Sequence, residues 1–301
     1  MRLFVTGASG FIGSAVVPEL LRAGHQVLGL ARSNSSAEAI AAAGAEVHRG
    51  TLDDPDSLHA GASAADGVVH LAFIHDFSDY EGAIKTDLRA IETFGAALEG
   101  TDRPLVIASG LLGSTPGRVA TERDRPAPGT TAPPREAAAQ TTLGLAERGV
   151  RSSVVRLAAS VHDEGDHGFV PRLIDIAREK GVSGYVGDGA NLWPAVHRLD
   201  AARLFRLAVE KAPAGSVLHG TAEKGVSLRT IAEVIGRHLG LPVVSVPAEQ
   251  AEGHFGWLAR FLAVSAPASN ALTRELLDWH PTGPGLIEDL DRGHYFGTPA
   301  A

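Results

Sequence analysis

Short apolar runs recur along the first half of the chain, each followed by a segment long enough for one helix. The runs are rich in β-branched residues and apolar at nearly every position, which is typical of strands buried on both faces of a parallel sheet. They lie at residues 2–6, 26–31, 45–50, 67–73, 103–110 and 151–158. The pattern predicts a sheet that is covered by helices on both sides.

The segments between these runs are rich in alanine and leucine and have helical spacing of their apolar residues. They lie at residues 11–24, 35–44, 54–62, 79–100 and 135–149. Regular alternation of strand and helix favours parallel pairing with right-handed crossovers. We therefore predict an α/β fold built on a doubly wound parallel sheet.

The pattern becomes irregular after Arg156. Helical spacing and short strand-like runs alternate less regularly there, at residues 169–181, 183–189, 200–212, 216–223, 227–240 and 241–247. We predict a main domain over residues 1–160 and a smaller substrate-binding lobe over residues 161–301, part of which returns to the main sheet. The segment Gly113–Pro134 is rich in Pro, Gly and Thr and long for a connection, which is typical of a functional loop over a site.

Charge and cysteine content exclude several classes of function. The chain of 301 residues has a formal net charge of −8, which argues against a nucleic-acid surface or a polybasic membrane anchor. It contains no cysteine, so disulfides, thiolate metal sites and a cysteine nucleophile are excluded. No apolar run approaches the roughly 18 residues of a membrane span, and residues 2–6 leave no room for a signal sequence. We expect a cytoplasmic protein with neither a membrane nor a nucleic-acid partner.

Three glycines separate the first predicted strand from the first predicted helix. Gly7, Gly10 and Gly13 stand in the stretch FVTGASGFIGSAV. Glycine is needed where a backbone turns tightly, approaches a pyrophosphate or packs closely on a helix. The helix that follows would direct unpaired N–H groups and the positive end of its dipole at the phosphates. A plain tight turn is the alternative, but the strand–turn–helix setting favours nucleotide binding.

The stretch TGASGFIG resembles the fingerprint of the short-chain dehydrogenase/reductase superfamily, in its extended or atypical branch. LARS, GTLDDPDSL, HLAF and WPAVHRLDAARLF strengthen the resemblance, which covers nearly the whole chain and is strongest over the first 160 residues. It implies a Rossmann-like fold and a bound nicotinamide dinucleotide. The cofactor contacts it implies are Gly7, Ser9, Gly10, Phe11, Ile12, Gly13, Thr51, Leu52, Leu71, Ala72, Phe73, Ser109, Leu157 and Ala158.

The end of the second predicted strand bears on which nucleotide is bound. An acid there would accept a hydrogen bond from the ribose 2′-hydroxyl of NAD, whereas an arginine accommodates the 2′-phosphate of NADP. The chain has Arg32 and Ser33 at this place. A solvated surface arginine is the alternative, but a guanidinium suits a phosphate, so we predict NADP(H). Relatives commonly carry an aspartate after the third strand for the adenine; Thr51 and Leu52 stand there instead.

One expected feature of the superfamily is missing. Most members carry a Tyr-x-x-x-Lys pair at the start of the helix before the sixth strand, where the tyrosine protonates the alkoxide and the lysine lowers its pKa. By alignment these places fall near Ala132 and Glu136. Neither side chain can supply that chemistry, and we expect Glu136→Gln to be tolerated. The serine that usually supports the pair falls at Ser109 or Gly110.

Other residues could replace the missing acid. Ser109, His75 and Tyr80 are the candidate catalytic residues. Aromatic, histidine and leucine side chains are expected to line the substrate pocket, namely Phe73, His75, Leu111, His162, Phe169, Trp193 and His197. The stretch HDEGDH suggests a metal site, but a hydrogen-bonded loop is favoured because the residues lack a convincing ligand geometry, and no metal is expected.

Two functions follow from these residues. The first is an NADPH-dependent reductase that transfers hydride to a C=O or C=N bond of a bulky, largely apolar ketone or imine. The second is a protein that binds NADP(H) as a sensor without chemistry. A homodimer through the helices at residues 80–98 and 135–148 is a further expectation.

Overall fold

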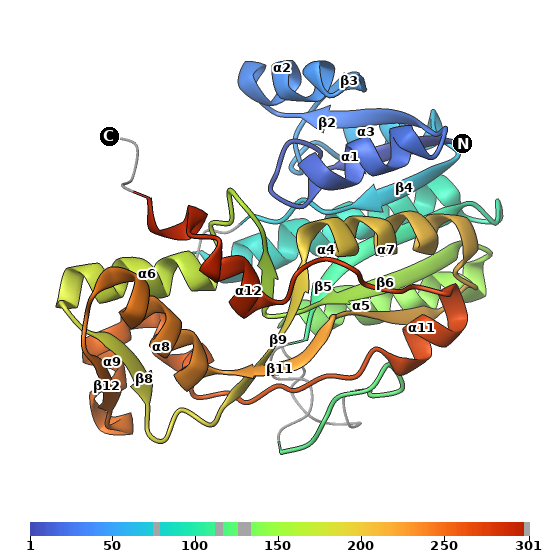
Figure 1. Ribbon diagram of the computed structural model, residues 1–301. Coiled ribbons are helices and arrows are strands. Elements are labelled where there is room, and N and C mark those ends of the chain that lie inside the picture. Colours follow the sequence, from blue (N-terminus) through green and yellow to red (C-terminus); the bar gives the residue numbers. More distant parts are fainter. Residues whose placement is uncertain (75–78, 112–116, 126–133, 298–301) are drawn as a thin grey trace.

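The computed structural model describes residues 1–74, 79–111, 117–125 and 134–297. It shows a large sheet with helices on both faces and a smaller lobe beside the carboxyl ends of the strands (Figure 1). The predicted fold class is confirmed, because every neighbouring pair of strands in the large sheet is parallel.

The large sheet has seven strands in the order β10-β6-β5-β4-β1-β2-β3. Their bounds are β1 (Arg2–Thr6), β2 (Gln26–Ala31), β3 (Glu46–Arg49), β4 (Gly67–His70), β5 (Pro104–Gly110), β6 (Arg151–Leu157) and β10 (Ser216–Gly220). The order reverses at β1, so β1 and β4 flank the place where an open α/β sheet binds its ligands. β10 comes from the C-terminal half of the chain and pairs with β6.

Helices cover both faces of this sheet. They are α1 (Gly13–Arg22), α2 (Asn34–Ala42), α3 (Pro55–Ser63), α4 (Tyr80–Leu98), α5 (Pro134–Gly144) with the 3₁₀ turn η1 (Leu145–Arg148), and α7 (Arg198–Lys211). One face packs against α1, α2 and α7, and the other against α3, α4 and α5. Because successive strand residues point to opposite faces, Val106 and Val155 lie on the first face and Ile107 and Val154 on the second.

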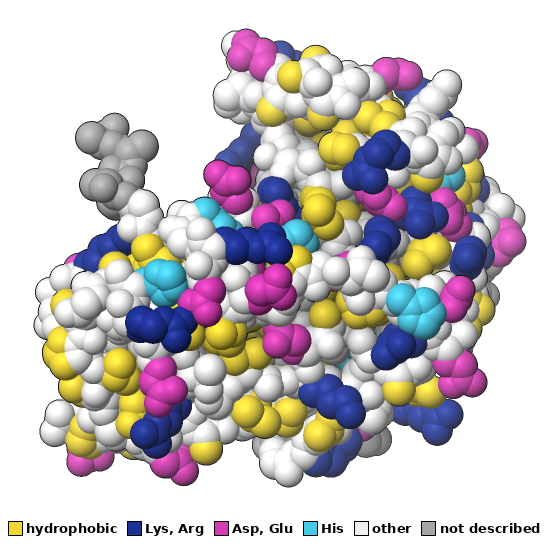
Figure 2. All heavy atoms as spheres, in the orientation of Figure 1, with side chains coloured by type: hydrophobic (Ala, Val, Ile, Leu, Met, Phe, Trp, Pro, Cys, Tyr) yellow, Lys and Arg dark blue, Asp and Glu magenta, His cyan; other side chains and the backbone are white. Residues whose placement is uncertain are grey.

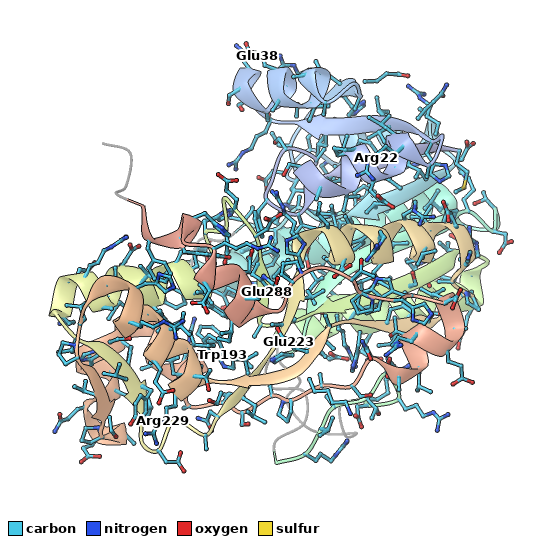
Figure 3. The ribbon with its side chains drawn as sticks, viewed as in Figure 1. Arg22, Glu38, Trp193, Glu223, Arg229 and Glu288 are labelled. Atoms are coloured by element: carbon cyan, nitrogen blue, oxygen red, sulfur yellow. The ribbon has the colours of Figure 1, made fainter. Side chains whose placement is uncertain are left out.

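The smaller lobe is built from short strands and helices. They are β7 (Ser160–His162), α6 (Phe169–Lys180), β8 (Ser183–Val186), β9 (Leu192–His197), β11 (Glu223–Ser227), α8 (Leu228–Leu239), β12 (Val243–Val246), η2 (Ala248–Gln250), α9 (Ala251–Phe255), η3 (Gly256–Leu258), α10 (Ala259–Leu262), α12 (Leu286–Asp291) and η4 (His294–Phe296). The helix α11 (Ala271–Leu277) instead packs against β10 and α7 of the main domain (Figure 1). The three-stranded sheet β11-β9-β7 was not predicted, because these strands are short and partly polar. The lobe has its own apolar core, in which Trp193 is fully buried (Figure 3).

Candidate functional site

The turn between β1 and α1 is shaped by its glycines. Gly7 has a φ of 68°, and a Cβ on it would lie 2.8 Å from the backbone nitrogen of Ala72. A Cβ on Gly13 would lie 2.0 Å from the Gly7 carbonyl oxygen. Gly10 is exposed and its N–H donates to that same carbonyl oxygen over 2.9 Å. The turn is therefore closed around its own backbone, with Gly10 on the open side and the first amides of α1 at its rim, an arrangement that fits a pyrophosphate.

The predicted 2′-phosphate site lies at the end of β2. Ser33 is the N-cap of α2, and its side chain accepts a hydrogen bond from the Ser36 amide over 3.1 Å. Arg32 is exposed and makes no hydrogen bond or ion pair with any residue in the described ranges. Arg49, at the end of β3, donates to the Ser33 carbonyl oxygen over 2.9 Å. Two exposed guanidinium groups therefore lie beside this loop.

The other predicted cofactor residues lie at or just after the ends of β3, β4, β5 and β6. Leu71, Ala72 and Phe73 come after β4, Ser109 is the last residue but one of β5, Leu157 ends β6 with Ala158 after it, and Thr51 and Leu52 come after β3. Because carboxyl ends of parallel strands meet at one edge of a sheet, these residues share an edge with the glycine turn. Their contacts with a dinucleotide stay predictions.

The catalytic candidates are only partly described. His75 lies outside the described residues, as do Ala132 and most of the long loop Gly113–Pro134. Tyr80 is the first residue of α4, and its ring centroid is 6.2 Å from that of Phe73. Ser109 is buried and lies in register with Arg156 on β6.

Arg156 explains what Glu136 does. The Arg156 guanidinium is 2% exposed and reaches the Glu136 carboxylate over 3.2 Å from the sixth strand to α5. It also donates to the Asp124 carbonyl oxygen over 3.0 Å. Glu136 is therefore the counter-charge of a buried arginine, and the expectation that Glu136→Gln would be tolerated needs correction, since the amide would leave Arg156 without a compensating charge.

A polar cluster joins the small lobe to the main domain. Nδ1 of the His162 ring donates to the Asp289 carboxylate of α12 over 2.9 Å, and both side chains are fully buried. The ring centroid of His197 is 5.5 Å from that of His162. Asp163 pairs with Arg198 over 3.0 Å. Acidic, basic and histidine side chains gather beside α12 where the two parts of the molecule meet (Figure 2).

Three side chains of this cluster, Asp163, His197 and Asp289, are close enough together to be considered as metal ligands. Ligand atoms of Asp163, His197 and Asp289 lie within 4.8 Å of one another, and Oδ1 of Asp289 has no hydrogen-bond partner among the described residues. However, Nδ1 of His197 accepts the Leu199 amide hydrogen over 3.3 Å as the cap of α7. A neutral ring with that acceptor carries its proton on Nε2, the nitrogen that would face a cation. The geometry therefore favours a hydrogen-bonded junction over a metal site.

The junction is predicted to weaken in acid. Burial lowers the pKa of His197 below its ordinary value, against the opposing effect of Asp163. In the unfolded chain His197 therefore takes up a proton near pH 6.5, whereas in the folded chain it takes up that proton only at lower pH. We expect the free energy of unfolding to fall as the pH is lowered below about 6.5, with a slope of at most about 1.4 kcal/mol per pH unit from this group.

Urea unfolding between pH 7.5 and 5 would measure this slope. Burial alone would raise the pKa of Asp289, but the hydrogen bond with His162 and the field of the histidines lower it, so its contribution is lost only at more acidic pH. A His197→Asn variant keeps a capping acceptor and should flatten the slope between pH 6.5 and 5. An unchanged slope in this variant would contradict the assignment.

The predicted pocket residues do not all face open space. Trp193 and His162 have no exposed surface, so the structure places them in the core and the junction rather than on a pocket wall. Leu111 is buried against Ala120 and Ala268. Phe169 packs on Trp193 with ring centroids 5.3 Å apart, and it also contacts aromatic rings of η3 and α10.

Sequence reasoning missed several members of these sites. Arg49 could have been found from its place at the end of the third strand, next to the predicted phosphate loop. Asp289 gave no local signal, because it lies 127 residues after its partner His162. Arg198 was missed for a similar reason: its guanidinium lies over the Phe11 ring of the glycine turn at 4.8 Å, a contact between distant segments.

Residues 3–91 match the model of the NAD-dependent epimerase/dehydratase family. The chain is 50% identical over 299 residues to an uncharacterized protein of Schizosaccharomyces pombe, covering 98% of this chain and 100% of that one. It is 28% identical to the 4-hydroxy-2-methyl-3-oxo-4-farnesyl-3,4-dihydroquinoline-1-oxide ketoreductase of Stigmatella aurantiaca, over 89% of this chain and 84% of that one. The fold matches the dTDP-glucose 4,6-dehydratase of Streptomyces venezuelae, solved with NAD bound, with a TM-score of 0.76 and 20% identity over 98% and 96% of the two chains.

No helix within the described ranges is long and apolar enough to span a membrane.

Proposed function

Because the chain belongs to the NAD-dependent epimerase/dehydratase family of short-chain dehydrogenases and reductases, we propose that it is an NADPH-dependent reductase. Its substrate is a bulky, largely apolar small molecule with a C=O or C=N bond. The observation that carries the proposal is the shared sheet edge, where the glycine turn after β1 and Ser109 of β5 stand on either side of β4. The ketoreductase activity named for a relative supports the same reaction class.

The preference for NADPH is supported by two guanidinium groups. Arg32 directly follows β2 and has no carboxylate partner among the described side chains. Arg49, on the adjacent strand β3, donates a hydrogen bond to the Ser33 carbonyl oxygen. Neither forms an ion pair within the described ranges, so both charges are available to an anion. A ribose 2′-hydroxyl would gain nothing from this arrangement, whereas a 2′-phosphate would gain charge-assisted hydrogen bonds.

We expect Arg32→Ala to weaken NADPH binding by roughly 10- to 100-fold, the loss of about one hydrogen bond to a charged group. NADH binding should change little, since it lacks the phosphate. Calorimetric titration of both nucleotides would measure this difference. Arg22→Ala is the matched control, because Arg22 is exposed at the far end of α1 (Figure 3). Equal affinity of the wild type for NADH and NADPH would refute the preference.

The substrate class follows from the proton that each reduction needs. When bound, the nicotinamide supplies the hydride. A ketone oxygen then becomes an alkoxide and needs a proton, whereas a protonated imine becomes a neutral amine and needs none. Ser109 can donate a hydrogen bond to a carbonyl oxygen, but Glu136 is committed to Arg156. We therefore infer that imines and activated ketones are the better substrates, and that simple ketones react slowly.

The test is a panel of cyclic imines, activated ketones and simple ketones, each incubated with the protein and NADPH. Loss of nicotinamide absorbance with imines or activated ketones is the expected result. Ser109→Ala should lower kcat for the ketones more than for the imines. Tight NADPH binding with no turnover of any compound would instead support the alternative, a sensor of NADP(H). If neither nucleotide binds, both functions are refuted.

A further inference from the structure

A buried chain of hydrogen bonds begins behind the glycine turn and ends on α4. The Ala72 amide donates to Thr6 Oγ1 over 3.2 Å, and Thr6 Oγ1 lies 2.7 Å from Nδ1 of His70. Nε2 of His70 lies 3.1 Å from Oδ1 of Asp87. The three side chains are 0%, 2% and 3% exposed, and the functional site described above uses none of them.

The direction of each bond follows from the donors available. Thr6 Oγ1 accepts from the Ala72 amide, so its own hydrogen can be donated to Nδ1 of His70. The ring then carries its proton on Nε2 and donates it to the Asp87 carboxylate. In this arrangement each bond has one donor and one acceptor, and the Asp87 carboxylate is the final acceptor. Phe94 holds the ring from the side, with centroids 5.2 Å apart.

A hydroxyl, an imidazole and a carboxylate in sequence also resemble a nucleophilic triad. Thr6 has no exposed surface and points into the layer between the sheet and α4. No substrate atom can reach its hydroxyl, so a nucleophilic role is excluded by position. The hydrogen-bond chain ends instead at the backbone amide of Ala72.

Ala72 is the residue at which the segment after β4 touches the glycine turn after β1. Its nitrogen is the atom that a Cβ on Gly7 would approach to 2.8 Å, so the glycine turn and the segment after β4 lie directly against each other. Thr6 immediately precedes Gly7, and His70 is its register partner on β4. The hydrogen-bond chain therefore fixes the spacing between the turn and the segment Leu71–Phe73.

We propose that Asp87 is a positioning residue for the dinucleotide, acting through His70 and Thr6 on the glycine turn and the segment after β4. The proposal rests on the proposed nucleotide binding. A buried carboxylate is costly unless it is compensated, and here its described partner is the ring it orients. A carboxylate often orients a histidine that in turn contacts the functional group, without contacting that group itself.

The test compares NADPH dissociation constants of variants that break or preserve the chain. Asp87→Ala leaves Nε2 of His70 without its acceptor, and Thr6→Val removes the hydroxyl while keeping the shape. We expect each to weaken NADPH binding by roughly tenfold, the cost of one unsatisfied buried group. Asp87→Asn and Thr6→Ser keep an acceptor and a hydroxyl, and should stay within about threefold of the wild type.

Two controls separate positioning from general damage. Thr142→Val removes another fully buried hydroxyl, one that donates to the Ala138 carbonyl oxygen within α5, and should leave NADPH binding unchanged. Adenosine 2′-phosphate probes only the region of Arg32 and should bind the Asp87 and Thr6 variants as it binds the wild type. The proposal is overturned if Asp87→Ala or Thr6→Val loses affinity for both ligands equally, or binds NADPH as the wild type does.

Amide hydrogen exchange keeps the test decisive if Asp87→Ala or Thr6→Val does not fold. In Asp87→Asn the amide oxygen is a weaker acceptor for His70 than the carboxylate, so the Ala72 amide should exchange faster than in the wild type by up to about threefold, while the Thr142→Val variant shows no change at Ala72. Unchanged protection at Ala72 would refute the coupling. Failure of the wild type to bind any dinucleotide would instead refute the proposed function and leave the coupling to be judged by exchange alone.

Discussion

Gly10→Val should abolish dinucleotide binding while leaving the fold nearly intact. Gly10 is exposed at the mouth of the turn, and its Cβ would meet only the Gly7 carbonyl oxygen, at 3.2 Å. A branched side chain there would occupy the space of the pyrophosphate. We expect NADPH affinity to fall by at least about 100-fold, since the phosphate contacts with the helix amides are charge-assisted.

Gly13→Ala is the informative comparison. A Cβ on Gly13 would lie 2.0 Å from the Gly7 carbonyl oxygen and 2.8 Å from the Ala8 backbone, so it damages the turn itself. This variant should lose folding stability as well as binding, whereas Gly10→Val should lose binding alone. Calorimetry and urea unfolding on both variants would separate the two effects. Normal NADPH binding by Gly10→Val would mean that this turn is only structural.

The second large effect is expected at the buried ion pair between α5 and β6. Glu136→Gln should lower the free energy of unfolding by about 3 kcal/mol, in the range found when one partner of a buried pair is removed. Arg156 keeps its bond to the Asp124 carbonyl oxygen but loses its counter-charge. Urea unfolding at pH 7 measures the change. Glu147→Gln, on an exposed position of η1, is the matched control and should stay within about 0.5 kcal/mol of the wild type.

A double variant tests whether the charge is the cause. Arg156→Met combined with Glu136→Leu removes both charges and fills the space with apolar groups, and such replacements are often neutral or stabilising. The double variant should therefore be more stable than Glu136→Gln alone. If it is less stable, the loss comes from packing of α5 and not from the unpaired guanidinium.

Local patterns predicted the sheet well because its strands are buried on both faces. The runs at β1, β2 and β5 are continuously apolar in their middle positions, and burial on both sides demands that. Strand ends were less accurate: β4 ends at His70, three residues before the predicted end, because the chain turns there to bring Ala72 against Gly7. The strand β7 is only three residues long and β11 is mostly polar, so no continuous apolar run marks them. The apolar run of β9 contains Pro194, a residue that argues against a strand.

The candidate site divides in the same way. The glycine turn and Arg32 could be predicted because their chemistry is carried by neighbouring residues in a strand–turn–helix unit. The roles of Glu136, His162 and His197 could not, because each is defined by a partner from a distant segment. Glu136 read in isolation looked like a substituted lysine position, whereas its contact with Arg156 makes it part of the core.

The pairing of His162 with Asp289 also bears on when the protein can fold during its synthesis. The two residues are 127 positions apart, and α12 is among the last elements of the chain. Strands β1 to β5 can pair while the ribosome is still translating, since domains fold from their N-terminal parts as they emerge. The junction of the small lobe must wait until α12 has left the exit tunnel, so a chain that stops short of Leu286 leaves the His162 imidazole without its carboxylate partner. Premature termination near the end of the message would therefore yield a protein with an assembled sheet and an unassembled lobe, a substrate for quality-control proteases.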